Sequence, residues 1–229
     1  MNESNMWKET DEELLQQIPE KLLTWYDKNA RVLPWRQDPR PYRVWVSEIM
    51  LQQTRVEAVK PYFERFLKAL PTVEDLAQAP EEQLLKLWEG LGYYSRVRNL
   101  QKGARAVMAE HGGVIPASFE ALKKLPGIGD YTAGAIGSIA FQIPVPAVDG
   151  NVLRVISRVL YRRDNILDAK VKRRIEGEIK EILPERTGDF NQSLMELGAT
   201  VCLPNGAPKC NECPLQELCR AHLVGDEES

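Results

Sequence analysis

The sequence predicts an all-α protein, and three observations support this prediction. Apolar residues recur at helical spacing, as in Leu84, Leu87, Trp88 and Leu91. Residues that begin and end helices recur between such segments. Alternating strand patterns are scarce, and no internal repeat is visible. From these signals we expect about ten helices.

Capping patterns mark two of the expected helix starts. Thr72 has Asp75 three residues later, which is a capping box, and Asp149 precedes an apolar helical run that begins at Val152. Residues 143–148 contain two prolines and predict an extended connector. Helix ends are predicted at Gly90, Gly92, Gly112, Gly113, Pro184 and Gly188.

Length and composition favour a soluble intracellular protein. The 229 residues suffice for one large domain or two small ones with a proper core. The N-terminal residues lack the apolar segment of a signal peptide, and no apolar run is long enough to span a bilayer. We therefore expect a cytoplasmic protein that has no membrane partner.

The net charge of −3 is unevenly distributed along the chain. Both ends are acidic, whereas residues 14–211 carry a net charge of +5. Arg154, Arg158 and Arg162 recur every four residues, so a helix would place them on one stripe. Such a stripe is either a solvated helix face or a set of phosphate contacts. The charge therefore permits a polyanionic partner without establishing one.

All four cysteines lie in the last 28 residues, at Cys202, Cys210, Cys213 and Cys219. Their spacing is C-x7-C-x2-C-x5-C. Four thiolates at irregular spacing are typical of a 4Fe–4S cluster. Structural zinc usually shows two short Cys pairs, of which only Cys210 and Cys213 make one, and disulfides belong to secreted chains. The spacing favours the cluster over zinc and over disulfides.

A glycine-containing turn separates two expected helices at residues 125–130, which read LPGIGD. The two glycines allow a tight turn whose backbone N–H groups, with the N-terminus of the next helix, can bind a phosphate. An isolated turn of this kind is more often only a connection between helices. Between two helices, it indicates a helix–hairpin–helix clamp for a DNA backbone.

Two carboxyl groups are candidates for acid and charge-stabilising roles. Glu48 lies in an otherwise apolar stretch, where lost hydration raises the pKa of a carboxyl group toward neutrality. Asp149 precedes a helix, whose N-terminus favours a charged carboxylate. Cleavage of a glycosidic bond needs such a pair. The alternatives are a solvated Glu48 and an Asp149 that is only a helix cap.

Aromatic side chains form a further candidate set. Trp35 is a core residue by default. Tyr93 and Tyr94 are adjacent and follow Gly92, so both cannot face one core. An exposed ring beside basic residues can stack on a base or fill a gap in a duplex.

Taken in order, SEIMLQQT, WEGLGYYSRVRNL, LPGIGDYTAGAI, PAVDGNVLRV and the four-cysteine segment closely resemble the MutY-type adenine DNA glycosylases. These enzymes belong to the helix–hairpin–helix superfamily with endonuclease III. The resemblance runs from about Arg31 to Cys219. It implies a helix–hairpin–helix DNA glycosylase fold with a six-helix barrel domain at 29–143. A helical iron–sulfur cluster domain would comprise 1–28 and 144–229, with DNA bound between the two.

The resemblance also implies a reaction, namely monofunctional removal of adenine mispaired with 8-oxoguanine or guanine during base excision repair. Glu48 matches the general acid that protonates adenine at N7. Asp149 matches the carboxylate that stabilises the sugar cation, with Asn151 beside it. Tyr131 occupies the place where related lyases have a Schiff-base lysine.

The binding residues follow from the same resemblance. The adenine pocket would be lined by Arg31, Trp35 and Gln192. The side chains that wedge the duplex open would be Gln53 and Tyr93, and the phosphate clamp would be Gly127, Ile128 and Gly129. The cluster ligands would be the four cysteines. The partner implied is double-stranded DNA that contains an adenine mispair, and we expect a monomer in a bacterial nucleoid.

The chain departs from the family pattern in three places. The first cysteine gap is one residue longer than is typical, and Asp130 puts an acid beside the phosphate clamp. The sequence ends ten residues after Cys219, where family members usually continue into a domain that reads 8-oxoguanine. We therefore expect weak discrimination between 8-oxoguanine and guanine. A thymine mismatch glycosylase and a non-enzymatic DNA-binding cluster module are the rival functions.

Overall fold

The computed structural model describes residues 7–227, and within them it is helical with no β-strand, which confirms the predicted all-α class. The chain divides into two compact units. The continuous unit is Arg31–Ala147, and the terminal unit combines Met1–Ala30 with Val148–Ser229. The domain boundaries expected from the sequence, at 29 and 143, lie within a few residues of this division. Residues 1–6 of the expected cluster domain lie outside the described residues.

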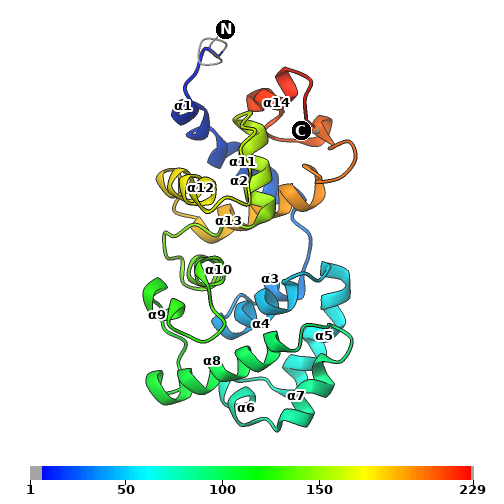
Figure 1. The fold of residues 1–229 in the computed structure, drawn as a ribbon, viewed down its shortest axis with the longest axis vertical. Coiled ribbons are helices and arrows are strands. Elements are labelled where there is room, and N and C mark those ends of the chain that lie inside the picture. Colours follow the sequence, from blue (N-terminus) through cyan, green and yellow to red (C-terminus); the bar gives the residue numbers. More distant parts are fainter. Residues whose placement is uncertain (1–6, 228–229) are drawn as a thin grey trace. The chain divides into compact units, whose positions relative to one another are not determined.

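The continuous unit is built around one buried helix. Its helices are α3 (Pro34–Gln37), α4 (Pro41–Leu51), α5 (Val56–Ala69), α6 (Val73–Gln78), α7 (Glu81–Trp88), α8 (Ser95–His111), α9 (Phe119–Lys123) and α10 (Asp130–Phe141) (Figure 1). Helix α4 begins with a proline at its first position, where the missing N–H costs nothing. Every residue from Val44 to Met50 is buried, and α4 packs against α5, α8 and α10. A helix that is apolar all round is expected to lie inside a core.

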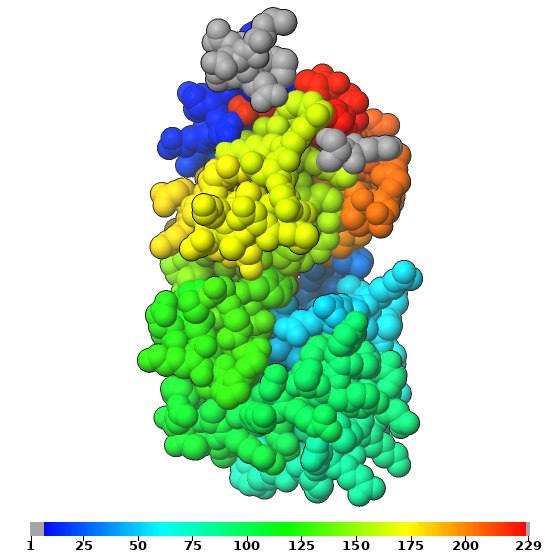
Figure 2. Space-filling model, viewed as in Figure 1, coloured from blue at the N-terminus to red at the C-terminus, as the bar shows by residue number. Residues whose placement is uncertain are grey.

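The terminal unit brings the two ends of the described chain together. Its helices are α1 (Asp11–Leu15), α2 (Ile18–Asn29), α11 (Gly150–Val159), α12 (Ala169–Glu181), α13 (Thr187–Thr200) and α14 (Arg220–Leu223), with short 3-10 helices at Cys210–Glu212 and Gln216–Leu218. Helix α13 packs against both α2 and α11. Helix α12 lies on the surface of this unit, where its yellow atoms face the viewer (Figure 2).

Residues far apart in the sequence join the first and last helices of the terminal unit. Asp11 accepts hydrogen bonds from Arg162 and from Arg220, which directly follows the last cysteine. Burial opposes ionisation of Asp11, but these two guanidinium groups outweigh it and lower the pKa of the carboxyl group. The N-terminal segment is therefore fastened to the cysteine-containing segment.

The predicted helix boundaries were correct where local patterns decided them. The capping box of Thr72 and Asp75 is present, and Asp149 caps α11. Residues 143–148 are non-helical, as predicted. Gly188 was wrongly predicted to end a helix, because it is the second residue of α13. The described residues contain fourteen α-helices rather than about ten, since several have only four to six residues and carry no visible periodicity.

None of the helices within residues 7–227 combines the length and the apolar character that a membrane span requires.

Candidate functional site

Glu48 is a buried acid with a defined partner. It lies on α4 and is only 7% exposed. The hydroxyl of Tyr131, from α10, donates a hydrogen bond of 2.8 Å to Glu48 Oε2. The contact is possible because α4 and α10 pack directly against each other. The sequence therefore identified both residues, but nothing in it showed that they touch.

The glycine turn between α9 and α10 has the geometry of a tight hairpin. Gly127 has φ +79°, a conformation that L side chains rarely adopt, and a Cβ there would meet Asn99 Cβ at 2.9 Å. Gly129 is exposed and caps α10 with extended backbone. Ile128 is buried, and its backbone N–H donates to Leu125 O at 3.1 Å. Because the Ile128 amide already donates within the turn, the amides left for a phosphate are those of the glycines and of the N-terminus of α10.

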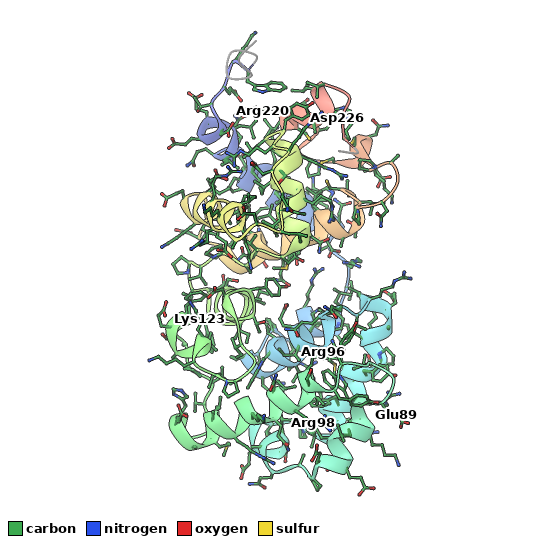
Figure 3. All side chains as sticks on the ribbon, viewed as in Figure 1. Glu89, Arg96, Arg98, Lys123, Arg220 and Asp226 are labelled. Atoms are coloured by element: carbon green, nitrogen blue, oxygen red, sulfur yellow. The ribbon has the colours of Figure 1, made fainter. Side chains whose placement is uncertain are left out.

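An ion pair lies next to this turn. Asp130, the first residue of α10, pairs with Lys123 of α9 at 2.6 Å, and the lysine also lies over the Phe119 ring. Lys123 is labelled in Figure 3. The acid that departs from the family pattern therefore faces a compensating cation rather than standing alone.

The two expected wedge residues occupy unusual backbone conformations in the continuous unit. Gln53 follows α4 and has φ +57°, and Tyr93 follows α7 and has φ +46°. Both side chains are exposed, Tyr93 to 65%. Non-glycine residues with positive φ are uncommon, and they gather at functional sites.

Asp149 caps α11 in the terminal unit, and both of its carboxylate oxygens accept hydrogen bonds. Val152 N donates to Oδ1 at 2.9 Å, and Asn151 Nδ2 donates to Oδ2 at 2.7 Å. Asn151 is in turn held by Arg154, whose Nη2 donates to Asn151 Oδ1 at 2.9 Å. These two donors fix the orientation of the carboxylate.

Arg154 links this group to the end of α13. Its guanidinium donates to Gly198 O at 2.7 Å and to Cys202 O at 2.9 Å. Helix α13 passes very close to Asn151 here, because a Cβ on Gly198 would lie 2.5 Å from Asn151 Cβ. A chain of hydrogen bonds thus runs from the backbone of the first cysteine to Asp149.

Arg154, Arg158 and Arg162 do not form the solvated helix face that was one interpretation of the sequence, because α11 ends at Val159 and each guanidinium has partners within the terminal unit. Arg154 donates to backbone carbonyls. Arg158 is 7% exposed and donates to Leu203 O at 2.8 Å and to Cys202 Sγ at 3.4 Å. Arg162 pairs with Glu178 at 2.9 Å and with Asp11. All three guanidinium groups are therefore engaged by carbonyl or carboxylate groups of neighbouring segments.

The four cysteines line one pocket of the terminal unit and form no disulfide. The pocket is also lined by Arg158, by apolar side chains of α11 and α13, and by Pro208, Gln216, His222 and Glu227. Burial raises the pKa of Cys213 to about 12 and that of Cys219 to about 11, and the neighbouring thiolates act in the same direction. Four thiols that line one pocket suit a positively charged inorganic centre, which neutralises thiolate charge and so offsets the burial of Cys213 and Cys219. The residues therefore fit a four-thiolate cluster.

A smaller donor set overlaps the cysteine pocket. Cys210, His222 and Glu227 bring ligand atoms within 4.8 Å of one another. His222 Nδ1 and Glu227 Oε1 are 2.6 Å apart, so the imidazole and the carboxylate already engage each other. This set offers one sulfur, whereas the pocket offers four.

The three expected adenine-pocket residues are distributed over both units. Trp35 is buried in the continuous unit, with its ring edge-on to Phe63 at 5.4 Å. Arg31 is half-buried at the start of that unit, and Gln192 is half-buried on α13. From the sequence, Arg96 had no role beyond that of a basic residue near Tyr93 and Tyr94. The signal for a role was its position in the first turn of a helix, where a positive charge is otherwise unfavourable.

Comparisons with known proteins agree on one family. Residues 46–181 match the family described as HhH-GPD superfamily base excision DNA repair protein. The chain is 51% identical over 211 residues to the adenine DNA glycosylase of Rattus norvegicus, covering 88% of this chain and 41% of that protein. The chain therefore spans less than half the length of that relative.

Solved structures give the same fold. A thermostable thymine-DNA glycosylase superposes with a TM-score of 0.83 at 29% identity, covering 92% of this chain and 97% of that one. A trapped endonuclease III–DNA covalent intermediate superposes with a TM-score of 0.74 at 26% identity, covering 92% and 98%.

Proposed function

Because the chain belongs to the HhH-GPD superfamily of base excision DNA repair proteins, we propose that it is a monofunctional adenine DNA glycosylase. Its reaction would be hydrolysis of the N-glycosidic bond of adenine mispaired with 8-oxoguanine or guanine in double-stranded DNA. The observation that carries this proposal is the buried acid Glu48 held by Tyr131 at 2.8 Å. The 51% identity to the rat adenine DNA glycosylase supports the choice of adenine.

In the proposed mechanism, Glu48 is the general acid. Its proton moves to N7 of adenine, and the bond between the sugar C1′ and the base nitrogen then breaks with its electron pair on the base. Tyr131 orients the carboxyl group. A tyrosine hydroxyl, unlike a lysine amine, forms no Schiff base with the sugar, so the enzyme releases the base without cleaving the strand.

Asp149 stabilises the positive charge that develops on the sugar. Its carboxylate is held by Val152 N and by Asn151, and a water molecule adds to C1′ to complete the hydrolysis, its released proton restoring the acid form of Glu48. The acid and the charged carboxylate therefore perform different tasks because their surroundings differ. Arg31, Trp35 and Gln192 would contact the extruded adenine, and Gln53 and Tyr93 would fill the gap it leaves.

We propose further that Cys202, Cys210, Cys213 and Cys219 bind a 4Fe–4S cluster. When bound, the cluster crosslinks a loop-rich segment that has little apolar core of its own, and so contributes to folding. Arg158, which donates to the Cys202 sulfur, would stabilise the negatively charged thiolates.

A thymine mismatch glycosylase is the second candidate, and the TM-score of 0.83 to a thymine-DNA glycosylase favours it. The decisive experiment is base release from duplexes with A opposite 8-oxoguanine, A opposite G and T opposite G. Adenine release without strand cleavage supports the first proposal, and thymine release supports the second. Duplex binding without release of any base would contradict both proposals and indicate a non-enzymatic DNA-binding protein.

A further inference from the structure

The side chain of Arg96 joins two segments that carry strained, exposed residues. Arg96 lies in the first turn of α8 and is labelled in Figure 3. One segment is the end of α4 with Gln53, and the other is the turn between α7 and α8 with Tyr93. The two segments are about forty residues apart in the sequence.

On the α4 side, Arg96 caps the helix that carries Glu48. Its Nη1 donates to Ile49 O at 3.1 Å and to Met50 O at 3.0 Å, and also to Gln52 O. The last carbonyls of a helix have no partner within the helix, and they form the negative end of its dipole. A guanidinium placed there donates hydrogen bonds to these carbonyls, and its positive charge offsets the negative end of the dipole. It also fixes the backbone up to Gln52, the residue before Gln53.

On the other side, the same guanidinium holds the turn that ends at Tyr93. Its Nη2 donates to Leu91 O at 3.0 Å and to Gly92 O at 3.1 Å. Gly92 O also accepts a bond of 3.1 Å from Nε1 of the fully buried Trp88. The residue before Tyr93 is therefore fixed in the same way as the residue before Gln53.

The start of this turn is anchored separately. Tyr62 donates from its hydroxyl to Glu89 O at 2.9 Å. Gly90 has φ +100°, and a Cβ there would come within 2.2 Å of the Tyr62 oxygen. Tyr62 therefore holds the entry to the turn, and Arg96 holds its exit.

The positive charge of Arg96 is stabilised by backbone carbonyl dipoles and by aromatic rings rather than by a carboxylate. Among the described residues no carboxylate pairs with it, and its guanidinium lies 5.3 Å from the Trp88 ring centroid and 5.7 Å from that of Tyr93. A lysine has only three donors at one point, so it cannot satisfy the five backbone carbonyls to which the two terminal nitrogens of Arg96 donate. This arrangement keeps two positive-φ residues in place while their side chains stay exposed.

We propose that Arg96 is a positioning residue that holds Gln53 and Tyr93 in the conformations from which their side chains enter the DNA duplex. This inference rests on the proposed function, in which those two side chains replace the extruded adenine. Arg96 acts through the wedge and not through the chemistry of Glu48. Its loss therefore matters only when the duplex has to be opened.

The test uses Arg96→Lys, with Arg98→Lys as the matched control. Arg98 lies on the same helix, where it forms an exposed ion pair with Glu81 at 2.8 Å. Single-turnover adenine release is measured on a paired A:8-oxoguanine duplex and on a strand whose target adenine lies in an unpaired loop. We expect Arg96→Lys to lose about 10–100-fold on the paired duplex, as misplacement of positioning groups typically does. On the loop substrate, and for the control on both substrates, rates should stay near wild type.

Two further variants keep the proposal falsifiable. In a Tyr93→Ala background, Arg96→Lys should cost little more, because residues that act as one unit are not additive. Tyr62→Phe removes only the entry anchor, and it tests the turn even if Arg96→Lys fails to fold. It should show the same preference for the loop substrate. Equal losses on both substrates, additive losses with Tyr93→Ala, or no loss in Arg96→Lys would each overturn the proposal.

The fluorescence of 2-aminopurine at the target position separates this proposal from the proposed function. Unstacking of this base raises its fluorescence, so the signal reports opening without chemistry. A wild-type protein that opens the duplex and releases no adenine would refute the proposed function alone. Arg96→Lys that opens the duplex as well as wild type does would refute the role of Arg96 alone.

Discussion

Replacing Gly198 with alanine tests whether helix spacing positions Asp149. The added Cβ would lie 2.5 Å from Asn151 Cβ and 3.1 Å from Asn151 O. Carbon atoms pack at about 3.5–4.0 Å, so α11 and α13 must separate by roughly 1 Å. Neither neighbouring atom is the end of a flexible side chain, and the backbone of α11 has to move.

The shift has two expected consequences. Overpacking a core costs about 1–3 kcal/mol of stability. A displacement of about 1 Å at a catalytic group typically costs about 10²-fold in rate. Gly198 O is also an acceptor for Arg154, so the orientation of Asn151 and of Asp149 changes with it.

The assay is single-turnover adenine release from an A:8-oxoguanine duplex, together with thermal unfolding. The matched control is Gly177→Ala, because Gly177 is exposed on α12 and a Cβ there meets nothing within 4 Å. That control should keep its rate and gain about 0.5–1 kcal/mol of stability from helix propensity. A Gly198→Ala protein with wild-type rate and stability would refute the claim that this contact positions Asp149.

The remaining predictions concern the acid, the cysteines and an arginine. Glu48→Gln keeps the shape but has no proton to give, so base release should fall by at least about 10²–10⁴-fold with duplex affinity unchanged; near wild-type turnover would remove Glu48 from the mechanism. Anaerobically purified protein should be brown with about four iron atoms per chain, and Cys202→Ser should lose iron and soluble yield before it loses chemistry; a colourless protein with stoichiometric zinc would contradict the cluster. Arg162→Gln should lower the unfolding temperature, because its partners are Glu178 and Asp11, and leave the salt dependence of DNA affinity unchanged. A shallower salt slope would show that Arg162 meets a phosphate.

Local patterns were read correctly from the sequence because the atoms involved are few residues apart. The Asp149 cap spans three residues, and so does the capping box of Thr72 and Asp75. The prediction that one of Tyr93 and Tyr94 is exposed also followed from a local argument, and in the structure both are exposed. Such features depend on local backbone geometry, which is the same whatever the rest of the fold.

Contacts between distant segments could not be read in this way. Glu48 and Tyr131 are 83 residues apart, and only the packing of α4 on α10 makes them neighbours. The interpretation of Arg154, Arg158 and Arg162 as a solvated helix face was wrong for the same reason. An i, i+4 repeat of arginines looks the same in the sequence whether it faces water, a phosphate or a carbonyl. The partners of Arg154 are Gly198 O and Cys202 O, which lie more than forty residues further along the chain.

Arg96 and Arg154 share one arrangement, in which the guanidinium donates to carbonyls at the end of a helix. Arg96 donates to the last carbonyls of α4, the helix of Glu48. Arg154 donates to carbonyls at the end of α13 and is linked by hydrogen bonds to Asp149 through Asn151. The C-terminus of a helix carries partial negative charge, so a guanidinium is stabilised there and in turn fixes the backbone. Each arginine thereby holds the backbone beside a residue of the proposed mechanism, Arg96 beside Gln53 and Arg154 beside Asn151 and Asp149.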